Sequence, residues 1–205
     1  MIQSPLSLLL GTNNTGKVQE LKALLSNLPL VLLTPSSISL DLCIEETGRS
    51  YQENAAIKAI TWSSRSGLAC LADDSGLEVD ALNGSPGLYS HRFTANPKAS
   101  DAERRKYLLE RLEYLPQPWT ARFQCAVAIV IPGQDLIQTT GTCEGEIIKE
   151  ERGMNGFGYD PIFMVQGKGK TMAELNLEEK NKISHRARAI QSARIVLIEK
   201  TNMDR

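Results

Sequence analysis

The stretch that decides the fold is "LLLGTNNTGKV", which runs from Leu8 to Val18. Its apolar start predicts a buried strand over Leu6–Leu10, and the apolar spacing from Gly16 to Leu28 predicts an amphipathic helix. Between them, Gly11 to Lys17 spell G-x-x-x-x-G-K, as in a phosphate-binding Walker A loop. A Walker A loop continues with Ser or Thr, whose hydroxyl ligates magnesium, but here the position is Val18. The pattern therefore leaves three interpretations open: a P-loop NTPase, another fold that binds phosphate at the same kind of turn, or an Asn-capped turn with a solvated lysine.

Strand-like and helix-like segments alternate along the rest of the chain. This order indicates an α/β protein with a mixed β-sheet and flanking helices, and 205 residues suit a single domain over 1–205, or two lobes around a cleft, without a linker. The turn "PGQD" predicts that the strands on either side of it pair as an antiparallel hairpin. The further strands expected are Leu30–Thr34, Leu68–Ala72, Ala121–Ile131 and Leu136–Ile148, and the further helices are Ser50–Ser64, Asp101–Leu115 with Asp101 as its cap, a polar segment over 172–183, and Ser184–Lys200.

Composition and charge exclude several classes of partner. A formal net charge of −1 gives no general attraction to nucleic acids or anionic membranes, so we expect neither as a partner. The four cysteines show no C-x-x-C spacing, which indicates free thiols and a reducing compartment. The N-terminal segment lacks the basic start of a signal peptide, and no apolar run approaches the roughly 18 residues of a membrane span. These features predict a cytoplasmic protein.

Acidic residues form two candidate clusters. Asp73 and Asp74 follow the apolar strand predicted over Leu68–Ala72, where carboxylates could hold magnesium next to a phosphate loop. The structural alternative is that Asp73 caps a turn and Asp74 is solvated. Glu45 and Glu46 form an acidic loop tip that is either solvent-exposed decoration or part of the same site. Lys58 either extends along its helix or points into that site, and the sequence leaves both open.

Cations and aromatics near the C-terminal end form a third candidate group. His185 and Arg186 would occupy the first turn of the last helix, where positive charge opposes the helix dipole. Such a placement indicates either a bound electron-rich ligand or neutralisation by Glu178 and Glu179. In "NGFGYDP", the glycines around Phe157 would let a flat ligand approach an aromatic ring, although core aromatics in a tight turn are the alternative.

Seven motifs, taken together and in order, carry a resemblance to a known family. They are "TNNTGK", "EETG", "ENAAIKA", "LADDSGLEVDAL", "SPGLYS", "FGYDPIF" and "EEKNKISHR". The chain from about Leu8 to Ile198 resembles the inosine triphosphate pyrophosphatases, also called XTP/dITP diphosphatases. The resemblance implies an elongated fold of two lobes around a central active-site cleft, a homodimer and Mg²⁺ as cofactor. It also implies hydrolysis of ITP, dITP or XTP to the monophosphate and pyrophosphate, which cleanses the nucleotide pool.

The same resemblance implies roles for individual residues. Asp74 matches the proton acceptor and, together with Glu45, the magnesium ligands. Asn13 departs from the glycine that many family members carry there, which leaves the detailed turn geometry open. The residues that match substrate contacts are Thr12, Asn13, Asn14, Thr15, Gly16, Lys17, Lys58, Ser75, Phe157, Gly158, Tyr159, Asp160, Lys180, His185 and Arg186.

Two other functions remain as alternatives. The loop and the strand "LACLADD" could be the Walker A and Walker B elements of a P-loop kinase or NTPase, against which Val18 argues. The chain could also be a nucleotide-sensing module without catalysis. Product identity would separate all three.

Overall fold

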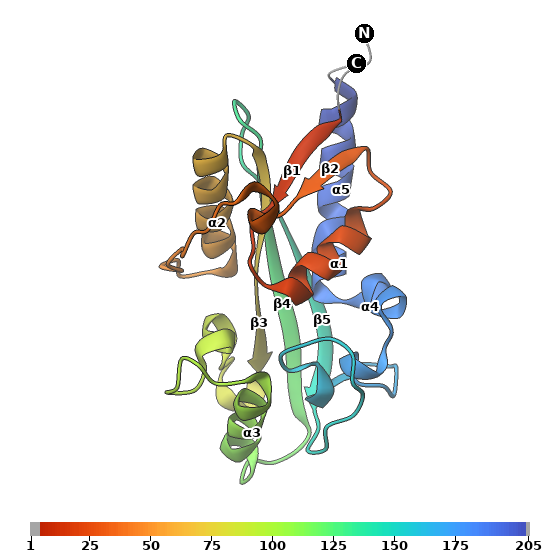
Figure 1. Cartoon of the computed structure of the whole chain (residues 1–205). Helices are drawn as coiled ribbons and strands as arrows, with labels where there is room; N and C mark the ends of the chain where they lie inside the picture. The colour runs from red at the N-terminus through yellow and green to blue at the C-terminus, as the bar shows by residue number, and fades with distance from the viewer. Residues whose placement is uncertain (1–4, 204–205) are drawn as a thin grey trace. The chain divides into compact units, whose positions relative to one another are not determined.

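The protein is described by a computed structural model that covers residues 5–203, and its chain forms two compact units (Figure 1). Unit 1 consists of the chain up to Asp74, Cys125–Gly141 and the segment from Arg186 onward. Unit 2 consists of Ser75–Gln124 and Thr142–His185. The predicted lack of a signal peptide concerns a segment that includes residues 1–4, which lie outside the described residues.

The strands are hydrogen-bonded in the order β2-β1-β3-β4-β5-β6. β1 runs parallel to β2 and to β3, with Leu8 opposite Ala69, whereas β5 and β6 are antiparallel, with Gly145 opposite Val165. The sheet is therefore mixed, which confirms the predicted fold class. The strands are β1 Leu6–Leu10, β2 Leu30–Leu33, β3 Ala69–Val79, β4 Trp119–Val130, β5 Ile137–Ile147 and β6 Phe163–Val165.

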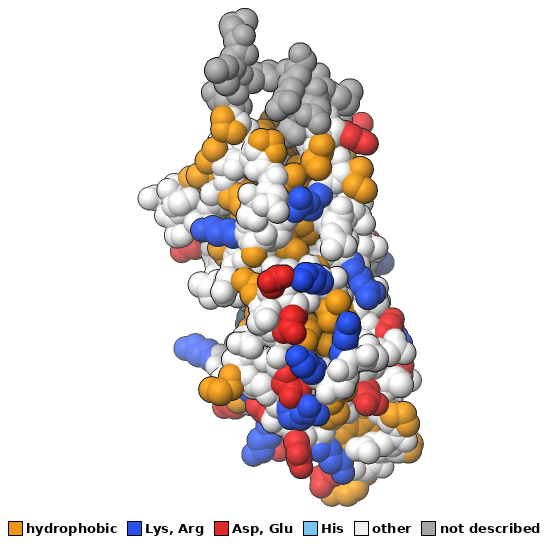
Figure 2. All heavy atoms as spheres, turned by 90° about the vertical axis from the view of Figure 1, so that its right-hand side faces the viewer, with side chains coloured by type: hydrophobic (Ala, Val, Ile, Leu, Met, Phe, Trp, Pro, Cys, Tyr) orange, Lys and Arg blue, Asp and Glu red, His pale blue; other side chains and the backbone are white. Residues whose placement is uncertain are grey.

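Five α-helices and several short 3₁₀ turns accompany these strands in the described chain (Figure 1). None of these helices is both long and apolar enough to cross a membrane. On the face shown in Figure 2, acidic and basic side chains intermingle and form no extended surface of one sign. The α-helices are α1 Thr15–Leu25, α2 Tyr51–Ser66, α3 Asp101–Leu112, α4 Leu177–Ile183 and α5 His185–Met203, and the 3₁₀ turns are η1 Pro35–Ile38, η2 Asp80–Leu82, η3 Gly87–Arg92, η4 Asp160–Ile162 and η5 Met172–Glu174.

Several predicted elements differ from those of the structure. Helix α1 ends at Leu25 and not at Leu28, α3 ends at Leu112 and not at Leu115, and the helical segment predicted over 172–183 divides into η5 and α4. The third strand does not end before Asp73, because β3 continues through both aspartates to Val79. The cap of α3 is Ser100 rather than Asp101, since the Ser100 hydroxyl accepts the Glu103 N–H and the Glu103 carboxylate accepts the Ser100 N–H in return. Strand β6 was not predicted at all. It has three residues, and pairing with β5 rather than local sequence defines it.

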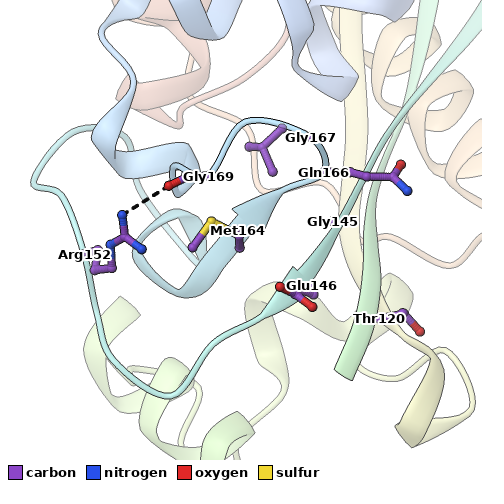
Figure 3. Close-up of a pocket in the computed structure, with 9 residues that line it drawn as sticks. Thr120, Gly145, Glu146, Arg152, Met164, Gln166, Gly167 and Gly169 are labelled. Carbon is purple, nitrogen blue, oxygen red and sulfur yellow. Dashed lines mark hydrogen bonds between the residues drawn. The ribbon is translucent and has the colours of Figure 1, made fainter. Parts of the chain in front are cut away.

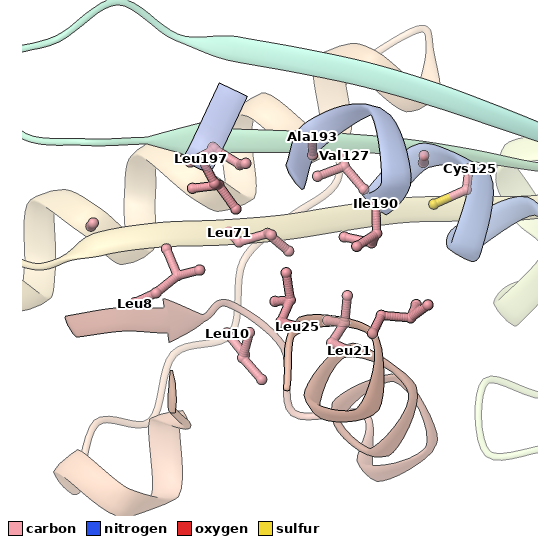
Figure 4. Close-up of a cluster of buried hydrophobic side chains, with 14 of the residues drawn as sticks. Leu8, Leu10, Leu21, Leu25, Leu71, Cys125, Val127, Ile190, Ala193 and Leu197 are labelled. Carbon is pink, nitrogen blue, oxygen red and sulfur yellow. The ribbon is translucent and has the colours of Figure 1, made fainter. Parts of the chain in front are cut away.

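The core of unit 1 explains the valine that follows the phosphate-loop lysine. Leu8, Leu10 and Leu71 from the parallel strands pack against α1 and α5 in one buried cluster (Figure 4). Val18 lies against this cluster, so the position that holds a hydroxyl in a Walker A loop here serves packing. The predicted free thiols are confirmed: Cys70, Cys125 and Cys143 are buried and Cys43 is exposed.

Unit 2 has its own core, in which side chains of β3, α3 and β4 pack on the turns that follow β5. Leu77, Leu108, Trp119, Phe163 and Met172 belong to it. Trp119 also donates its indole N–H to the carbonyl of Leu115. Each unit therefore buries an apolar cluster of its own.

A buried ion network ties α1, β3 and α5 together inside unit 1. The Asp73 carboxylate is fully buried, and its Oδ2 lies 3.0 Å from Lys17 Nζ and 3.0 Å from Arg186 Nη2. Arg186 is buried too, and its Nη1 pairs with the Glu20 carboxylate. Burial alone would raise the pKa of Asp73, but the charges of Lys17 and Arg186 hold it well below its usual range. Asp73 therefore stays ionised in the interior.

This network predicts that Glu20 matters for stability. Glu20→Ala leaves Arg186 with one carboxylate fewer in a dry interior, and breaking a buried ion pair costs about 3 to 5 kcal/mol of unfolding free energy. Urea denaturation followed by circular dichroism would measure the change. The matched control is Glu178→Ala, which removes an exposed carboxylate paired with Lys182 and should change stability little. Equal small losses from both variants would contradict the prediction.

Candidate functional site

The predicted phosphate loop joins β1 to α1 in unit 1. The Asn14 side chain caps the helix by accepting the Lys17 N–H at 3.0 Å, and the Asn14 N–H donates to the Thr12 hydroxyl at 3.2 Å. The first-turn amides therefore face the loop at the positive end of the helix dipole. The Lys17 side chain is 15% exposed, and its ammonium lies 3.0 Å from Asp73 Oδ2. Thr12 to Lys17 thus place backbone amides and one cation around a single turn.

The second candidate cluster centres on Asp74 in β3. Its Oδ1 accepts from Lys58 Nζ at 2.8 Å, and its Oδ2 accepts from Asn54 Nδ2 at 3.2 Å. Lys58 also pairs with Glu46 at 2.9 Å, so its ammonium bridges two carboxylates. Of the two alternatives that the sequence left open for Lys58, the structure shows the one in which it points into the acidic cluster.

The protonation equilibria of this cluster are shifted from their ordinary values. Burial raises the pKa of Asp74, although Lys58 and Lys17 act in the opposite direction. The pKa of Lys58 is also raised, because the attraction of Asp74, Asp73 and Glu46 outweighs the cost of its burial. Asp74 is thus a buried carboxylate that is held by the side chains of Lys58 and Asn54. Many general bases lie in a low-dielectric environment of this kind.

The donor set in this region fits a hard divalent cation. Asp74 and Glu46 gather carboxylate oxygens on one ammonium, and Asp73 Oδ1 is a buried oxygen with no hydrogen-bond partner. Glu45, the other predicted ligand, lies exposed in the loop after η1. No three or more His, Cys, Asp or Glu side chains within residues 5–203 converge as a ready metal site. Magnesium is commonly bound by only one or two protein carboxylates, together with substrate phosphates and water. A magnesium site with two carboxylates therefore does not need a third protein ligand.

Arg186 lies in unit 1 with its guanidinium directed at Glu20 and Asp73. These pairs explain how a cation is tolerated in the first turn of α5. The neutralising carboxylates are not Glu178 and Glu179, as one alternative had it. Glu178 pairs with Lys182, and the Glu179 carboxylate accepts the Asn176 N–H in the capping box of α4. The base-reading role that the resemblance implies for Arg186 therefore competes with a structural role.

The segment Asn155 to Pro161, which we call the aromatic loop, lies wholly in unit 2. The Phe157 N–H donates to Asp160 Oδ2 at 2.9 Å, and Lys180 pairs with the same oxygen. Gly156 has a φ of +76°, and a Cβ there would lie 2.0 Å from Asp160 Oδ2, so only glycine fits. Tyr159 is buried in the unit 2 core and donates to the Ser90 carbonyl at 2.9 Å, which matches the alternative of a core aromatic. The Phe157 ring remains half-buried.

Three further predicted site residues also belong to unit 2. Lys180 is almost fully buried, and its ammonium lies 5.1 Å from the centroid of the Phe157 ring. The His185 imidazole stacks on Phe123 with ring centroids 4.7 Å apart. Ser75 directly follows Asp74 in β3. The structure thus groups Phe157 to Asp160 with Lys180, and separately groups Thr12 to Lys17 with Lys58 and Asp74.

Sequence reasoning missed several residues that hold these groups in place. Asn54 positions Asp74, and its Oδ1 accepts the Gly48 N–H at 2.8 Å. It lies four residues before Lys58 on α2, so helical spacing alone could have placed both on one face. Glu20 gave no such signal, because its partner Arg186 is 166 positions away. For Asp101 the sequence predicted only the role of a helix cap and not its hydrogen bond with Gly158.

A separate pocket in unit 2 contains none of the predicted site residues. Its volume is about 530 Å³, and Arg152 lies at its edge, where its guanidinium donates to the Gly169 carbonyl (Figure 3). The side chain of Arg152 also pairs with Glu174 at 3.0 Å. The lining residues are Thr120, Gly145, Glu146, Arg152, Met164, Val165, Gln166, Gly167 and Gly169.

Comparison with known proteins identifies the family of this chain. The sequence model of the Ham1 family matches residues 8–195. A dITP/XTP pyrophosphatase of Bacillus licheniformis is 48% identical over 190 residues, which are 92% of this chain and 96% of that protein. Another, from Desulforamulus reducens, is 45% identical over 94% of this chain and 96% of its own. The solved HAM1 protein of Coxiella burnetii is 42% identical with a TM-score of 0.85, over 95% of this chain and 99% of that one. The chain therefore belongs to the Ham1 family.

Proposed function

We propose that this protein is a dITP/XTP pyrophosphatase that hydrolyses non-standard purine nucleoside triphosphates to the monophosphate and pyrophosphate. The observation that carries the proposal is the acidic cluster around Asp74, which adjoins Ser75 and is held by Lys58 and Asn54. Relatives that share 44–48% of their residues with this chain carry the name dITP/XTP pyrophosphatase. The family and the cluster together support hydrolysis at a phosphoanhydride bond.

The phosphate end of the substrate would be bound by Thr12 to Lys17. The amides of the first turn of α1 and the Lys17 ammonium supply positive charge without a side-chain metal ligand in the loop. Lys58 would add a second cation to the phosphate site. Its ammonium already pairs with Asp74 and Glu46, and a metal ion bound to the phosphates would contact carboxylates of the same cluster. Lys17 would offset the negative charge that develops on the departing pyrophosphate.

Asp74 would act as the proton acceptor for the attacking water. Its pKa is raised by burial, which makes the carboxylate a stronger base than an exposed aspartate. Asp74 and Glu45 would hold Mg²⁺, which when bound supplies charge neutralisation of the phosphate oxygens. Asn54 would keep the Asp74 carboxylate oriented both for its role as proton acceptor and for its role as metal ligand.

The base end would be recognised by the aromatic loop of unit 2. The half-buried Phe157 ring would stack on the purine, and Lys180 and His185 would donate to its 6-oxo group. Adenine carries an amino group there and would leave a buried donor unsatisfied, at a cost of about 1 to 3 kcal/mol. Arg186 was assigned to this task by resemblance, and its pairs with Glu20 and Asp73 favour the other candidates.

We further propose that the enzyme works as a cytoplasmic homodimer on free nucleotides. The dimer and the compartment follow from the resemblance and from the reduced cysteines. The alternative of a P-loop kinase loses support, because Val18 packs against the core cluster of unit 1 and Lys58 pairs with Asp74. A sensor without catalysis would bind dITP and release no product.

The reaction predicts a metal-dependent release of pyrophosphate. With dITP and Mg²⁺ the protein should release pyrophosphate and dIMP in equal amounts, whereas with excess chelator the release should stop, since the substrate charge is then unscreened. A coupled pyrophosphate assay with dATP as the comparison substrate would measure this. Unchanged release in the presence of chelator would contradict the metal proposal, and equal rates on dATP would contradict the base recognition.

The cluster predicts that Asp74→Asn abolishes most turnover without unfolding the protein. Loss of a proton acceptor lowers kcat by about 100-fold or more. Because burial already disfavours the Asp74 charge, a neutral amide of the same size should not reduce the melting temperature. The control is Glu78→Gln, which neutralises a partly exposed carboxylate further along β3. Near-normal kcat for Asp74→Asn would refute the assignment.

A further inference from the structure

Helix α3 holds both backbone polar groups of one residue, Gly158, in the aromatic loop. Asp101 Oδ2 accepts the N–H of Gly158 at 2.7 Å, and Arg105 Nη1 donates to the carbonyl oxygen of Gly158 at 2.9 Å. Both side chains project from the first turns of the same helix, which is more than fifty positions away in sequence. The backbone at Gly158 is therefore fixed from both directions by ionised side chains, and hydrogen bonds of this kind are the stronger ones.

Asp101 takes no part in the capping box of α3. Ser100 and Glu103 already complete the capping box of α3. Asp101 instead pairs with Arg104, and although burial alone would raise its pKa, the Gly158 N–H and Arg104 keep that pKa below its usual value. The Asp101 carboxylate is thus ionised at neutral pH and ready to accept from Gly158.

Arg105 is held in one geometry by a second partner. Its Nε and Nη2 both donate to the Glu151 carboxylate at 2.8 Å, which is the bidentate arrangement of an arginine and a carboxylate. The Arg105 side chain is only 12% exposed. The remaining nitrogen, Nη1, is directed at Gly158. A lysine at this position could not make the same three contacts.

Gly158 adjoins the aromatic residue that the proposed function assigns to base stacking. Gly158 has a φ of +63° and directly follows Phe157, whose own N–H is fixed by Asp160. Because the backbone is held at both Phe157 and Gly158, the direction in which the Phe157 side chain leaves the backbone is fixed. We propose that Asp101 and Arg105 are positioning residues that orient Phe157 for the purine. This inference rests on the proposed function and adds residues that do not touch the substrate.

The inference predicts an effect on KM and not on kcat. Asp101→Ala and Arg105→Ala should each raise the KM for dITP by about tenfold and leave kcat within about twofold, because the loss falls on base binding and not on Asp74. Asp101→Asn should recover most of the affinity, since its amide oxygen can still accept the Gly158 N–H. The control is Lys106→Ala, an exposed residue of the same helix, which should change neither constant.

A double-mutant cycle separates positioning from a general structural role. In a Phe157→Ala background, Asp101→Ala should add little further increase in KM, because its effect passes through the missing ring. Fully additive effects of the two substitutions would overturn the inference. So would an Asp101→Ala variant whose KM equals that of the unaltered protein.

Amide hydrogen exchange tests, independently of activity, the clamp that Asp101 and Arg105 form on the backbone of Gly158. The Gly158 N–H should exchange faster in Asp101→Ala than in the Lys106→Ala control, whereas amides of the β4 core should exchange as before. Unchanged exchange at Gly158 would overturn the clamp even if dITP is hydrolysed. If the unaltered protein releases no pyrophosphate, the proposed function fails, and the exchange result still decides whether the clamp exists.

Discussion

The fully buried carboxylate of Asp73 is the constraint on which unit 1 depends. A negative charge in the interior is tolerated only when cations and hydrogen bonds compensate it, and here Lys17 and Arg186 do so. Because Lys17 comes from α1 and Arg186 from α5, the same charge holds both helices to β3. The phosphate-loop lysine is therefore placed by the core of the unit, and a second carboxylate, Glu20, completes the balance.

This arrangement accounts for a loop that has the spacing of a Walker A motif without its hydroxyl. Val18 packs against the apolar cluster beneath α1 and has no side-chain oxygen with which to ligate a metal. The carboxylates that suit magnesium lie instead on β3 and in the loop before α2. The two neighbouring aspartates have different partners: Asp73 pairs with Lys17 and Arg186, whereas Asp74 pairs with Lys58 and accepts a hydrogen bond from Asn54.

The parts of the structure that local sequence determines were predictable. The first strand, the existence of α1 and the two strands on either side of the "PGQD" turn follow from apolar spacing and turn residues over short distances. The length of β3 and the existence of β6 were not, because neighbouring strands define them. For the site, the motif residues were predictable as types, but the pairing of Arg186 with Glu20 and the hold of Asp101 on Gly158 join segments far apart in the chain. No periodicity reports such contacts.

The central claim is that the bond between the α- and β-phosphates is cleaved. A ³¹P NMR spectrum recorded during the reaction of dITP with Mg²⁺ tests it most directly, because it identifies every phosphorus product at once. The account predicts that the triphosphate signals are replaced by one monophosphate signal and one pyrophosphate signal of the same molar amount. The appearance of inorganic phosphate together with a nucleoside diphosphate would contradict it.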